Sequence, residues 1–316
     1  MAEGGTVAIL GAGMAGAAAA RRLAEAGLDV RVFDKGRGVG GRMATRRTQA
    51  GARFDHGAQF FRAKGEAFRA QCAAWIAVGV AASWDTEGRD VGLPGMPAPA
   101  RHLLHGLPVS LETTIARIAR ADDGWMLTDA AGATTGPFAA VAVTFPAPQV
   151  TALMVESGVA LPGTERASYA PCWSLLLDLD AAPGFPETHL TFSEGPIALI
   201  AREETKPGRA PGHRLVVHAA PDWSRAHLEE AREAVQAALV AALEVRLGTS
   251  VRPTYAAVHR WRYAMVETAL GQPCLYDPAR RLGAAGDWCL GPRIEAAFDS
   301  GRALADRIAA NLKGGR

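Results

Sequence analysis

The chain has 316 residues, of which 49% are hydrophobic and 21% are charged, the balance of an ordinary globular protein. A chain of this length can bury a sizeable core without disulfides or metals, as one large α/β unit or as two connected domains. Its formal net charge is only +2 and its basic residues are scattered, which argues against a nucleic-acid or membrane surface.

The start of the chain predicts a β-α-β unit. Residues 6–10 (TVAIL) form an apolar run next to glycines, which is typical of a buried parallel strand. Residues 15–26 are rich in alanine and arginine and predict a helix that stops at Gly27. Residues 29–33 (DVRVF) predict the second strand. Segment 36–62 is rich in glycine and arginine, so we expect it to be loop for much of its length.

The rest of the chain predicts further strands and three helices. Helical patterns cover residues 64–80, 225–247 and 294–312, and the three prolines of segment 91–100 argue against a regular element there. The predicted strands are short apolar runs bounded by turn residues: 125–128, 139–144, 173–179, 189–192, 197–201, 215–219, 255–263 and 282–285. The four predicted strands between residues 173 and 219 are expected to belong to a second sheet.

The cysteines and the N-terminus predict a cytoplasmic protein. The four cysteines lie far apart without a CxxC pair, which favours free thiols in a reducing compartment. No basic region precedes the first glycine motif, and no run approaches the ~18 apolar residues that a membrane span needs. His102 and His105 have no third ligand nearby, so we expect no metal site.

A glycine motif links the first predicted strand to the first helix. Gly11 permits a tight turn, Gly13 lets the backbone approach a pyrophosphate, and Gly16 lets the helix pack on the sheet. The free N–H groups of that helix then face the phosphate charge. Asp34 ends the second strand, where an acid accepts hydrogen bonds from a ribose. This context predicts a site for NAD or FAD, and a turn without a ligand is the alternative.

Two further segments carry a resemblance that selects FAD. Residues 35–42 read KGRGVGGR, and residues 282–297 read LGAAGDWCLGPRIEAA. These resemble the FAD-binding amine-oxidase and renalase superfamily, in which a Gly-Gly-Arg turn passes beside the pyrophosphate and a Gly-Asp pair contacts the ribityl chain. The helix after Asp287 would then point its N-terminus at the flavin, where the positive end favours the anionic reduced form.

Two more segments are similar to the renalase branch of that superfamily. Residues 54–61 (FDHGAQFF) resemble the segment where the chain leaves the FAD domain beside the flavin ring, and residues 259–263 (HRWRY) resemble a strand near the flavin. On that strand Arg260 and Arg262 share one face and Trp261 takes the other, and one of the two faces is expected to look at the flavin. The likeness covers both ends of the chain, and residues 150–250 only in outline.

The resemblance implies an α/β fold of the p-hydroxybenzoate hydroxylase/amine oxidase type. A Rossmann-like FAD-binding domain would comprise residues 1–62, 98–148 and 270–316, and a discontinuous mixed-sheet substrate domain would comprise 63–97 and 149–269. No cysteine matches the family's attachment motif, so FAD is expected to bind non-covalently. The residues expected to hold it are Gly11, Gly13, Met14, Ala15, Gly16, Asp34, Lys35, Gly40, Gly41, Arg42, Gly57, Ala58, Gln59, Phe60, Val109, Gly286, Asp287, Ile294, Glu295 and Ala296. The residues expected to face substrate and flavin, with no acid or base required, are Gln59, His259, Trp261 and Arg262.

The function implied is oxidation of dihydro-NAD(P) isomers by hydride transfer to the flavin, with O2 as the acceptor that yields H2O2. A flavin amine oxidase, or another FAD-dependent oxidase of a small substrate, is the alternative, and a non-catalytic flavin-binding protein is a third. Flavin amine oxidases commonly hold a lysine near flavin N5 on a substrate-domain strand. Here the expected substrate domain offers Lys64, in a loop beside Gly65, and Lys206, in the turn-rich segment KPGRAPG. Neither lies on a predicted strand, which favours the first function. We expect a monomer or a weak homo-oligomer.

Overall fold

The computed structural model describes residues 5–314. It begins with the predicted β-α-β unit, β1 (Val7–Leu10), α1 (Met14–Glu25) and β2 (Val30–Phe33). These strands belong to a six-stranded sheet, here called the first sheet, of order β17-β18-β11-β1-β2-β7, in which all neighbours are parallel except β17 and β18. Its other strands are β7 (Val109–Ser110), β11 (Ala140–Val143), β17 (Leu275–Asp277) and β18 (Leu282–Ala284). The predicted Rossmann-like domain is confirmed.

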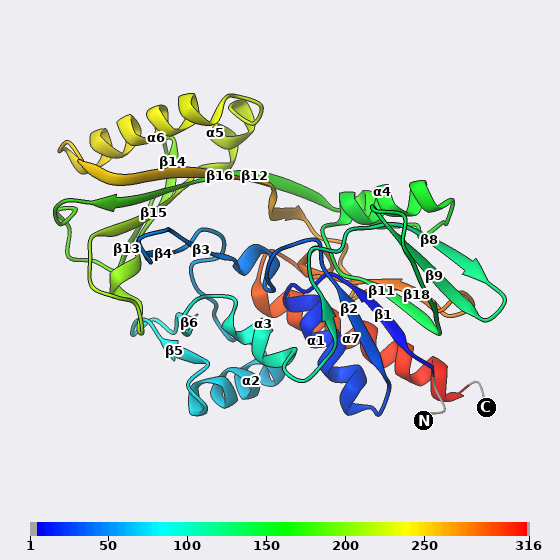
Figure 1. Cartoon of the computed structure of the whole chain (residues 1–316). Helices are drawn as coiled ribbons and strands as arrows, with labels where there is room; N and C mark the ends of the chain where they lie inside the picture. Colours follow the sequence, from blue (N-terminus) through cyan, green and yellow to red (C-terminus); the bar gives the residue numbers. More distant parts are fainter. Residues whose placement is uncertain (1–4, 315–316) are drawn as a thin grey trace.

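Both faces of the first sheet are covered, which explains why its strands are apolar at successive positions. On one face α1 packs beside α7 (Ile294–Gly314), and Gly301 lets the two helix backbones approach (Figure 1). The elements on the other face are β8 (Ile115–Ala121), β9 (Gly124–Asp129), β10 (Thr134–Phe138) and α4 (Ala147–Ser157). Within residues 5–314, each helix is too short or too polar to cross a lipid bilayer.

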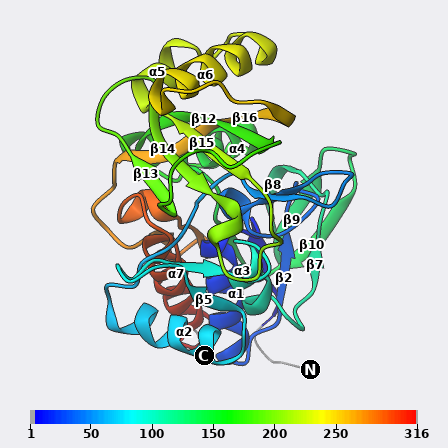
Figure 2. The same ribbon diagram turned by 90° about the vertical axis from the view of Figure 1, so that its left-hand side faces the viewer.

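The second sheet has five strands in the order β13-β14-β15-β12-β16, with two helices on its outer face (Figure 2). Every neighbouring pair is antiparallel, although the sequence predicts a mixed sheet. The crossover through the two helices joins β15 to β16, and β12 lies between those strands, so they do not pair. The elements are β12 (Ser168–Leu179), β13 (His189–Thr191), β14 (Ile197–Arg202), β15 (Arg214–Ala219), α5 (Pro221–Ala226), α6 (Arg232–Leu247) and β16 (Pro253–Thr268).

The single helix predicted over residues 225–247 is two helices, because the chain leaves the helical path at residues 227–231. The break frees backbone carbonyls that the second sheet uses. Trp173 Nε1 donates to the His227 carbonyl at 3.0 Å, and Arg260 Nη1 donates to the Leu228 carbonyl at 2.6 Å.

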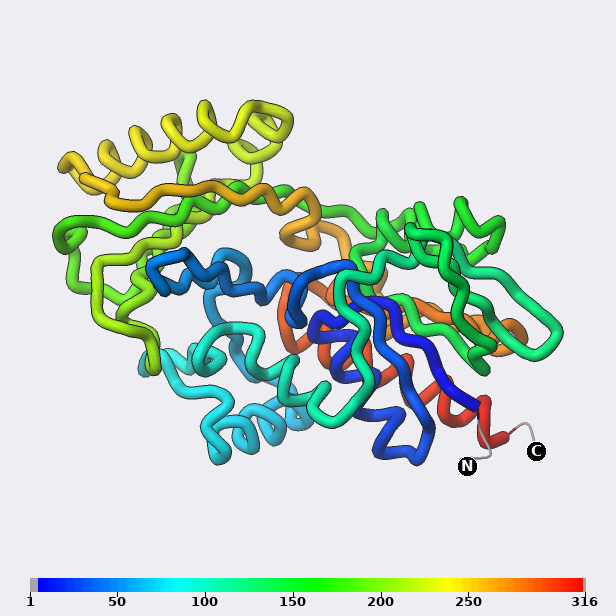
Figure 3. The backbone as a smooth tube through the Cα atoms, viewed as in Figure 1, coloured from blue at the N-terminus to red at the C-terminus, as the bar shows by residue number. Residues whose placement is uncertain are grey.

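The segment between the two sheets is more ordered than predicted. It runs from the end of β2 to the inner face of the second sheet (Figure 3) and contains a short hairpin that contacts β15.

In the proline-rich segment, residues 91–100, Pro99 falls in the first turn of a helix and so removes no helical hydrogen bond. Residues 66–77, expected in the substrate domain, form a helix whose Phe68 ring lies 5.2 Å from that of Phe298 on α7. The short elements are η1 (Gly41–Met43), β3 (Thr45–Arg47), β4 (Arg53–Asp55), α2 (Glu66–Ala77), β5 (Ala81–Ser83), β6 (Asp90–Gly92), α3 (Ala98–Leu103), η2 (Thr164–Arg166), η3 (Glu203–Thr205) and η4 (Asp287–Cys289).

Candidate functional site

The turn between β1 and α1 leaves one open position. Gly11 has a φ of +111°, which only glycine adopts readily. A side chain at Gly16 would overlap the Gly11 carbonyl oxygen, so this glycine lets the helix start directly on the turn. A Cβ at Gly13, in contrast, would meet no protein atom within 4 Å. The N-terminus of α1 therefore has room for a ligand at Gly13, where its free N–H groups favour an anion.

Asp34 lies beside this turn, at the carboxyl end of β2. Its carboxylate accepts hydrogen bonds from the backbone N–H of Ala12 and of Gly36, each at 2.6 Å. The acid therefore ties the glycine turn to the loop that follows β2. On the edge strand β7, the carbonyls on either side of Val109 bond to β2, so the carbonyl of Val109 itself faces away from the sheet. Lys35 is exposed and lies 3.5 Å from Gln149.

The Gly-Gly-Arg turn and the Gly-Asp pair meet at one point. Gly40 and Gly41 have φ values of +113° and +55°, and the turn directs Arg42 toward η4. Arg42 Nη2 pairs with Asp287 at 2.6 Å, and Nη1 donates to the Ala264 carbonyl at 3.1 Å. Burial works to lower the pKa of Arg42, but the Asp287 charge outweighs it and raises that pKa. The guanidinium expected at a pyrophosphate is thus held by a carboxylate.

Residues 56–58 pack directly on this turn. The Ala58 N–H donates to the Arg42 carbonyl at 2.9 Å, and any side chain at Gly57 would overlap that same carbonyl oxygen. Trp261 on β16 donates from Nε1 to the His56 carbonyl at 2.8 Å. The FDHGAQ segment therefore connects the Gly-Gly-Arg turn to the second sheet.

A cavity of about 490 Å³ lies between the first domain and the second sheet. Met14, the first residue of α1, lines it, so the cavity is continuous with the start of the helix at the glycine turn. Strands of the second sheet form its cover and contribute Pro171, Cys172, His218, Ala219, Trp261, Ala264 and Met265. Segment 57–64 and the start of α7 complete the wall.

The structure brings nine of the predicted residues to this cavity. They are Met14, Gly40, Arg42, Gly57, Ala58, Phe60, Trp261, Asp287 and Ile294. Others surround the glycine turn instead, or support the wall from behind: Gly11, Gly13, Ala15, Gly16, Asp34, Lys35, Gly41, Val109, Gly286, Glu295 and Ala296. The Gly286 N–H, for example, donates to Ser300 Oγ at 3.0 Å.

Arg262 lies on the face of β16 that points away from the cavity, so the structure does not bring it to the cavity as the sequence predicts. The alternation along the strand is as predicted: Trp261 lines the cavity, and Arg260 and Arg262 point outward. Glu229, in the connection between α5 and α6, pairs with both arginines: with Arg260 at 3.0 Å and with Arg262 at 2.6 Å. His259 lies on the inner face, its ring 4.3 Å from that of Trp261.

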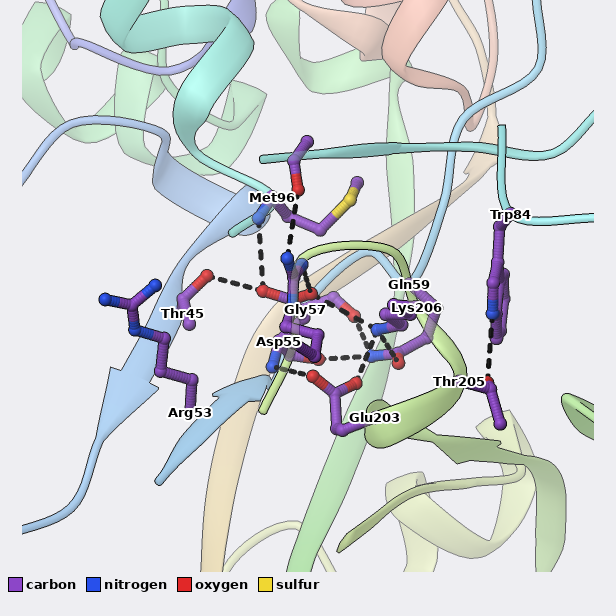
Figure 4. Close-up of polar contacts among 12 residues, drawn as sticks. Thr45, Arg53, Asp55, Gly57, Gln59, Trp84, Met96, Glu203, Thr205 and Lys206 are labelled. Atoms are coloured by element: carbon purple, nitrogen blue, oxygen red, sulfur yellow. Dashed lines mark hydrogen bonds and ion pairs between the residues drawn. The ribbon is translucent and has the colours of Figure 1, made fainter. Parts of the chain in front are cut away.

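Gln59 is buried behind the cavity wall in a cluster of charged side chains (Figure 4). Its Oε1 accepts from Lys206 Nζ at 3.0 Å, and its Nε2 donates to the Gly57 carbonyl and lies 3.4 Å from His218 Nε2. Lys206 is fully buried, where it pairs with Glu203 and with Asp55. The sequence places Lys206 in a turn, and the structure confirms that position but shows that the ammonium group is enclosed.

The acid at the centre of this cluster is Asp55, which ends β4. Arg209 Nη2 pairs with it at 2.6 Å, and Lys206 Nζ lies 3.2 Å away. Burial alone would raise the pKa of Asp55, but these two cations outweigh it and lower that pKa to about 2. The ionised carboxylate anchors the FDHGAQ segment against the second sheet.

Sequence reasoning missed His218, which lines the cavity from β15. The strand reads RLVVHA, and Leu215 and Val217 face the outer core, so His218 points to the inner face. That alternation is the signal that would have identified it. Burial and the Lys206 charge lower the pKa of His218 to about 4, so the imidazole is neutral at pH 7.

These features fit the parts of an FAD molecule. The open position at Gly13, beside a helix N-terminus and an acid, suits an adenosine diphosphate. The cavity that starts at Met14 has the size and the apolar wall that a flavin ring needs. The start of α7 lies at the cavity through Ile294, where its dipole favours negative charge.

Comparison with known proteins agrees with this geometry. Residues 9–74 match the NAD(P)-binding Rossmann-like domain, and residues 80–309 match the flavin containing amine oxidoreductase family. The fold is similar to a protein named as a protoporphyrinogen oxidase from Exiguobacterium sp. 255-15 (14% identity, TM-score 0.78, 98% of this chain and 99% of that one). It is also similar to cyclohexylamine oxidase from Brevibacterium oxydans IH-35A (13%, 0.72, 98% and 99%) and to a CLA-producing fatty acid isomerase from P. acnes (12%, 0.71, 97% and 99%). The chain therefore belongs to the family of flavin-containing amine oxidoreductases and is an FAD-dependent oxidoreductase.

Proposed function

We propose that the protein oxidises dihydro-NAD(P) isomers, as a renalase-like oxidase, rather than amines. The observation that carries the proposal is the make-up of the cavity cover. Strands β12, β15 and β16 present Pro171, Cys172, His218 and Trp261 to the cavity, and none of their lining residues is a lysine. The strand-borne lysine that the resemblance associates with amine oxidation therefore has no counterpart on this cover.

The two lysines near the site lie outside the strands that cover the cavity. Lys206 lies behind the wall, paired with two buried carboxylates. Lys64 lines the cavity, but it comes from the exposed loop before α2 and not from the second sheet. Neither side chain is positioned on the cover, where it would face a substrate lying against the flavin.

The cavity is suited to hydride transfer without proton transfer from the protein. Bound FAD supplies a two-electron acceptor: the dihydronicotinamide carbon gives up a hydride and its ring becomes aromatic, and O2 then takes two electrons and two protons to form H2O2. Trp261 and Phe60 line the cavity and offer aromatic surfaces for a flat ring. Hydride loss from the dihydronicotinamide needs no acid or base, and the neutral His218 and the Asp287–Arg42 pair on the cavity wall are compatible with this.

Anaerobic mixing of the FAD-loaded protein with candidate substrates tests this function. We expect the 2- and 6-dihydro isomers of NAD(P) to bleach the flavin absorbance rapidly and cyclohexylamine to leave it unchanged. Trp261→Ala is expected to slow bleaching about fivefold, because a stacking contact worth about 1 kcal/mol is lost. Arg262→Ala changes the neighbouring residue on the opposite face and is expected to keep the wild-type rate.

The alternative is an amine oxidase, which the family match favours. Bleaching by primary amines but not by the dihydro isomers would establish that alternative and refute the proposal.

A further inference from the structure

The mouth of the cavity carries three cationic side chains. Arg62 and Lys64 follow the FDHGAQFF segment, and Arg293 lies directly before α7; all three line the cavity. The side chains of Arg62 and Arg293 are 41% and 49% exposed, so they can reach a molecule that enters from solvent. Here these three residues are called the basic rim.

A buried carboxylate fixes the position of the basic rim. Glu295 is 4% exposed, and its Oε1 accepts from the backbone N–H groups of Lys64, at 3.1 Å, and Gly65. The other oxygen, Oε2, accepts no hydrogen bond from the described residues and lies 3.9 Å from Arg293 Nε. Glu295 therefore holds a loop and a helix start together, although 230 positions separate it from Gly65.

The charge at the mouth is not balanced by the cavity itself. Asp287 is the one carboxylate among the lining residues, and Arg42 pairs with it. Arg62 pairs with Glu87, whose side chain is 65% exposed and also binds Arg89, and Arg293 lies 3.9 Å from the buried Glu295. The first turn of α7, a helix of 21 residues, adds the positive end of its dipole beside Arg293. The mouth thus holds three cations against two carboxylates, Glu87 and Glu295, so it favours an anion over a cationic amine.

We infer that the basic rim is a binding site for the phosphate groups of the substrate. The inference rests on the proposed function and deepens it: the ring to be oxidised enters the apolar cavity, and its phosphate-bearing tail stays at the mouth. Lys64 and Arg293 supply charge-assisted hydrogen bonds from two sides, and Arg62 adds a third cation. The substrate is on this view a phosphorylated dihydronicotinamide and not the free ring.

The test compares substrates with and without phosphate on the FAD-loaded enzyme. For the dihydro isomer of NAD, Lys64→Ala and Arg293→Ala are each expected to raise KM about tenfold, the loss of one charge-assisted hydrogen bond, while kcat stays unchanged. For the matching dihydronicotinamide riboside, which has no phosphate, the same variants are expected to leave KM unchanged. Arg69→Ala removes an exposed positive charge from α2 that does not line the cavity, and it is expected to leave both KM values unchanged.

A second arm does not depend on turnover. Inorganic pyrophosphate, titrated into the FAD-loaded enzyme by calorimetry, is expected to bind the wild type and the Arg69→Ala variant. The Lys64→Ala/Arg293→Ala double variant is expected to lose that binding. If this pattern appears but no dihydro isomer bleaches the flavin, the proposed function fails and the phosphate site stands. Equal KM values across the variants, or no pyrophosphate binding to the wild type, would overturn the inference.

Discussion

Arg42 and Asp287, which lie 245 positions apart in the chain, form a 2.6 Å ion pair on the wall of the cavity. The pair joins the turn after β2 to the turn before α7, so the two ends of the chain close one site. The motifs that the resemblance assigns separately to pyrophosphate and to ribityl are thus physically one unit.

Replacing Arg42 is expected to lower the free energy of unfolding more than replacing an ordinary surface arginine does. In Arg42→Ala the Asp287 carboxylate, whose side chain is 10% exposed, loses its partner. We expect the free energy of unfolding to fall by about 3 kcal/mol and FAD to dissociate more readily. Urea unfolding and FAD titration measure both effects.

The matched control is Arg22→Ala, which breaks a 2.7 Å pair with Asp306 whose side chains are 41% and 54% exposed. That loss is expected to be within about 1 kcal/mol. Equal losses in the two variants would show that Arg42 and Asp287 contribute no more than a surface pair.

Substitutions at two glycines of the motif between β1 and α1 are expected to have different effects. Gly16→Ala forces its Cβ onto the Gly11 carbonyl oxygen, so we expect a large loss of stability. Gly13→Ala meets no protein atom within 4 Å and has an ordinary φ of −75°, so the protein is expected to fold normally. Its added methyl group fills the space where the pyrophosphate is expected, and FAD affinity is expected to drop. Normal FAD binding by folded Gly13→Ala would place the pyrophosphate elsewhere.

Local sequence patterns predict side-chain direction correctly where a single physical rule determines it. The alternation on β16 correctly separated Trp261 from Arg262, because side-chain direction in a strand follows a period of two. Which face meets the cavity depends on the position of α5 and α6, because the connection between these helices supplies Glu229 to the outer face. That position is tertiary and has no local signal.

Long-range contacts account for the residues that sequence reasoning misplaced. The resemblance predicts Gln59 at the flavin, but its amide is held between Lys206 and the Gly57 carbonyl behind the wall. The turn-rich KPGRAPG segment predicts a turn at Lys206 but gives no sign that its side chain is buried. Its burial depends on Asp55, which is 151 positions away, and no pattern within one segment reveals that pairing.

We expect the flavin to be released when the protein is denatured with acid. Cys172 is the cysteine that lines the cavity, and burial raises the pKa of its thiol to about 12, so almost no thiolate exists at neutral pH. The absorbance of the supernatant after precipitation measures the released FAD, and Cys172→Ala is expected to behave like the wild type. Yellow colour that stays with the precipitated wild-type chain would contradict this prediction.

Three histidines around the cavity are expected to make the protein sensitive to mild acid. Burial is the main cause in each case, and it lowers the pKa of His56 to about 3 and those of His218 and His259 to about 4. In the unfolded chain each would take up a proton near pH 6.5. Stability from these residues is therefore fully present above pH 6.5 and is lost as the pH falls from about 6.5 toward 4. Each histidine contributes a slope of up to about 1.4 kcal/mol per pH unit in that window.

Urea unfolding at several pH values, with FAD in constant excess, measures this slope. We expect the free energy of unfolding to fall steadily between pH 6.5 and 4.5 in the wild type. His259→Gln keeps a polar side chain of similar size but cannot titrate, so it is expected to make the slope shallower by up to about 1.4 kcal/mol per pH unit. His259 is the choice for substitution because its ring packs against Trp261 and not in the cluster around Lys206. A stability that stays constant from pH 7 to 4.5 would mean that these imidazoles gain protons as easily in the folded protein as in the unfolded chain. The same slope in the variant would mean this of His259 alone.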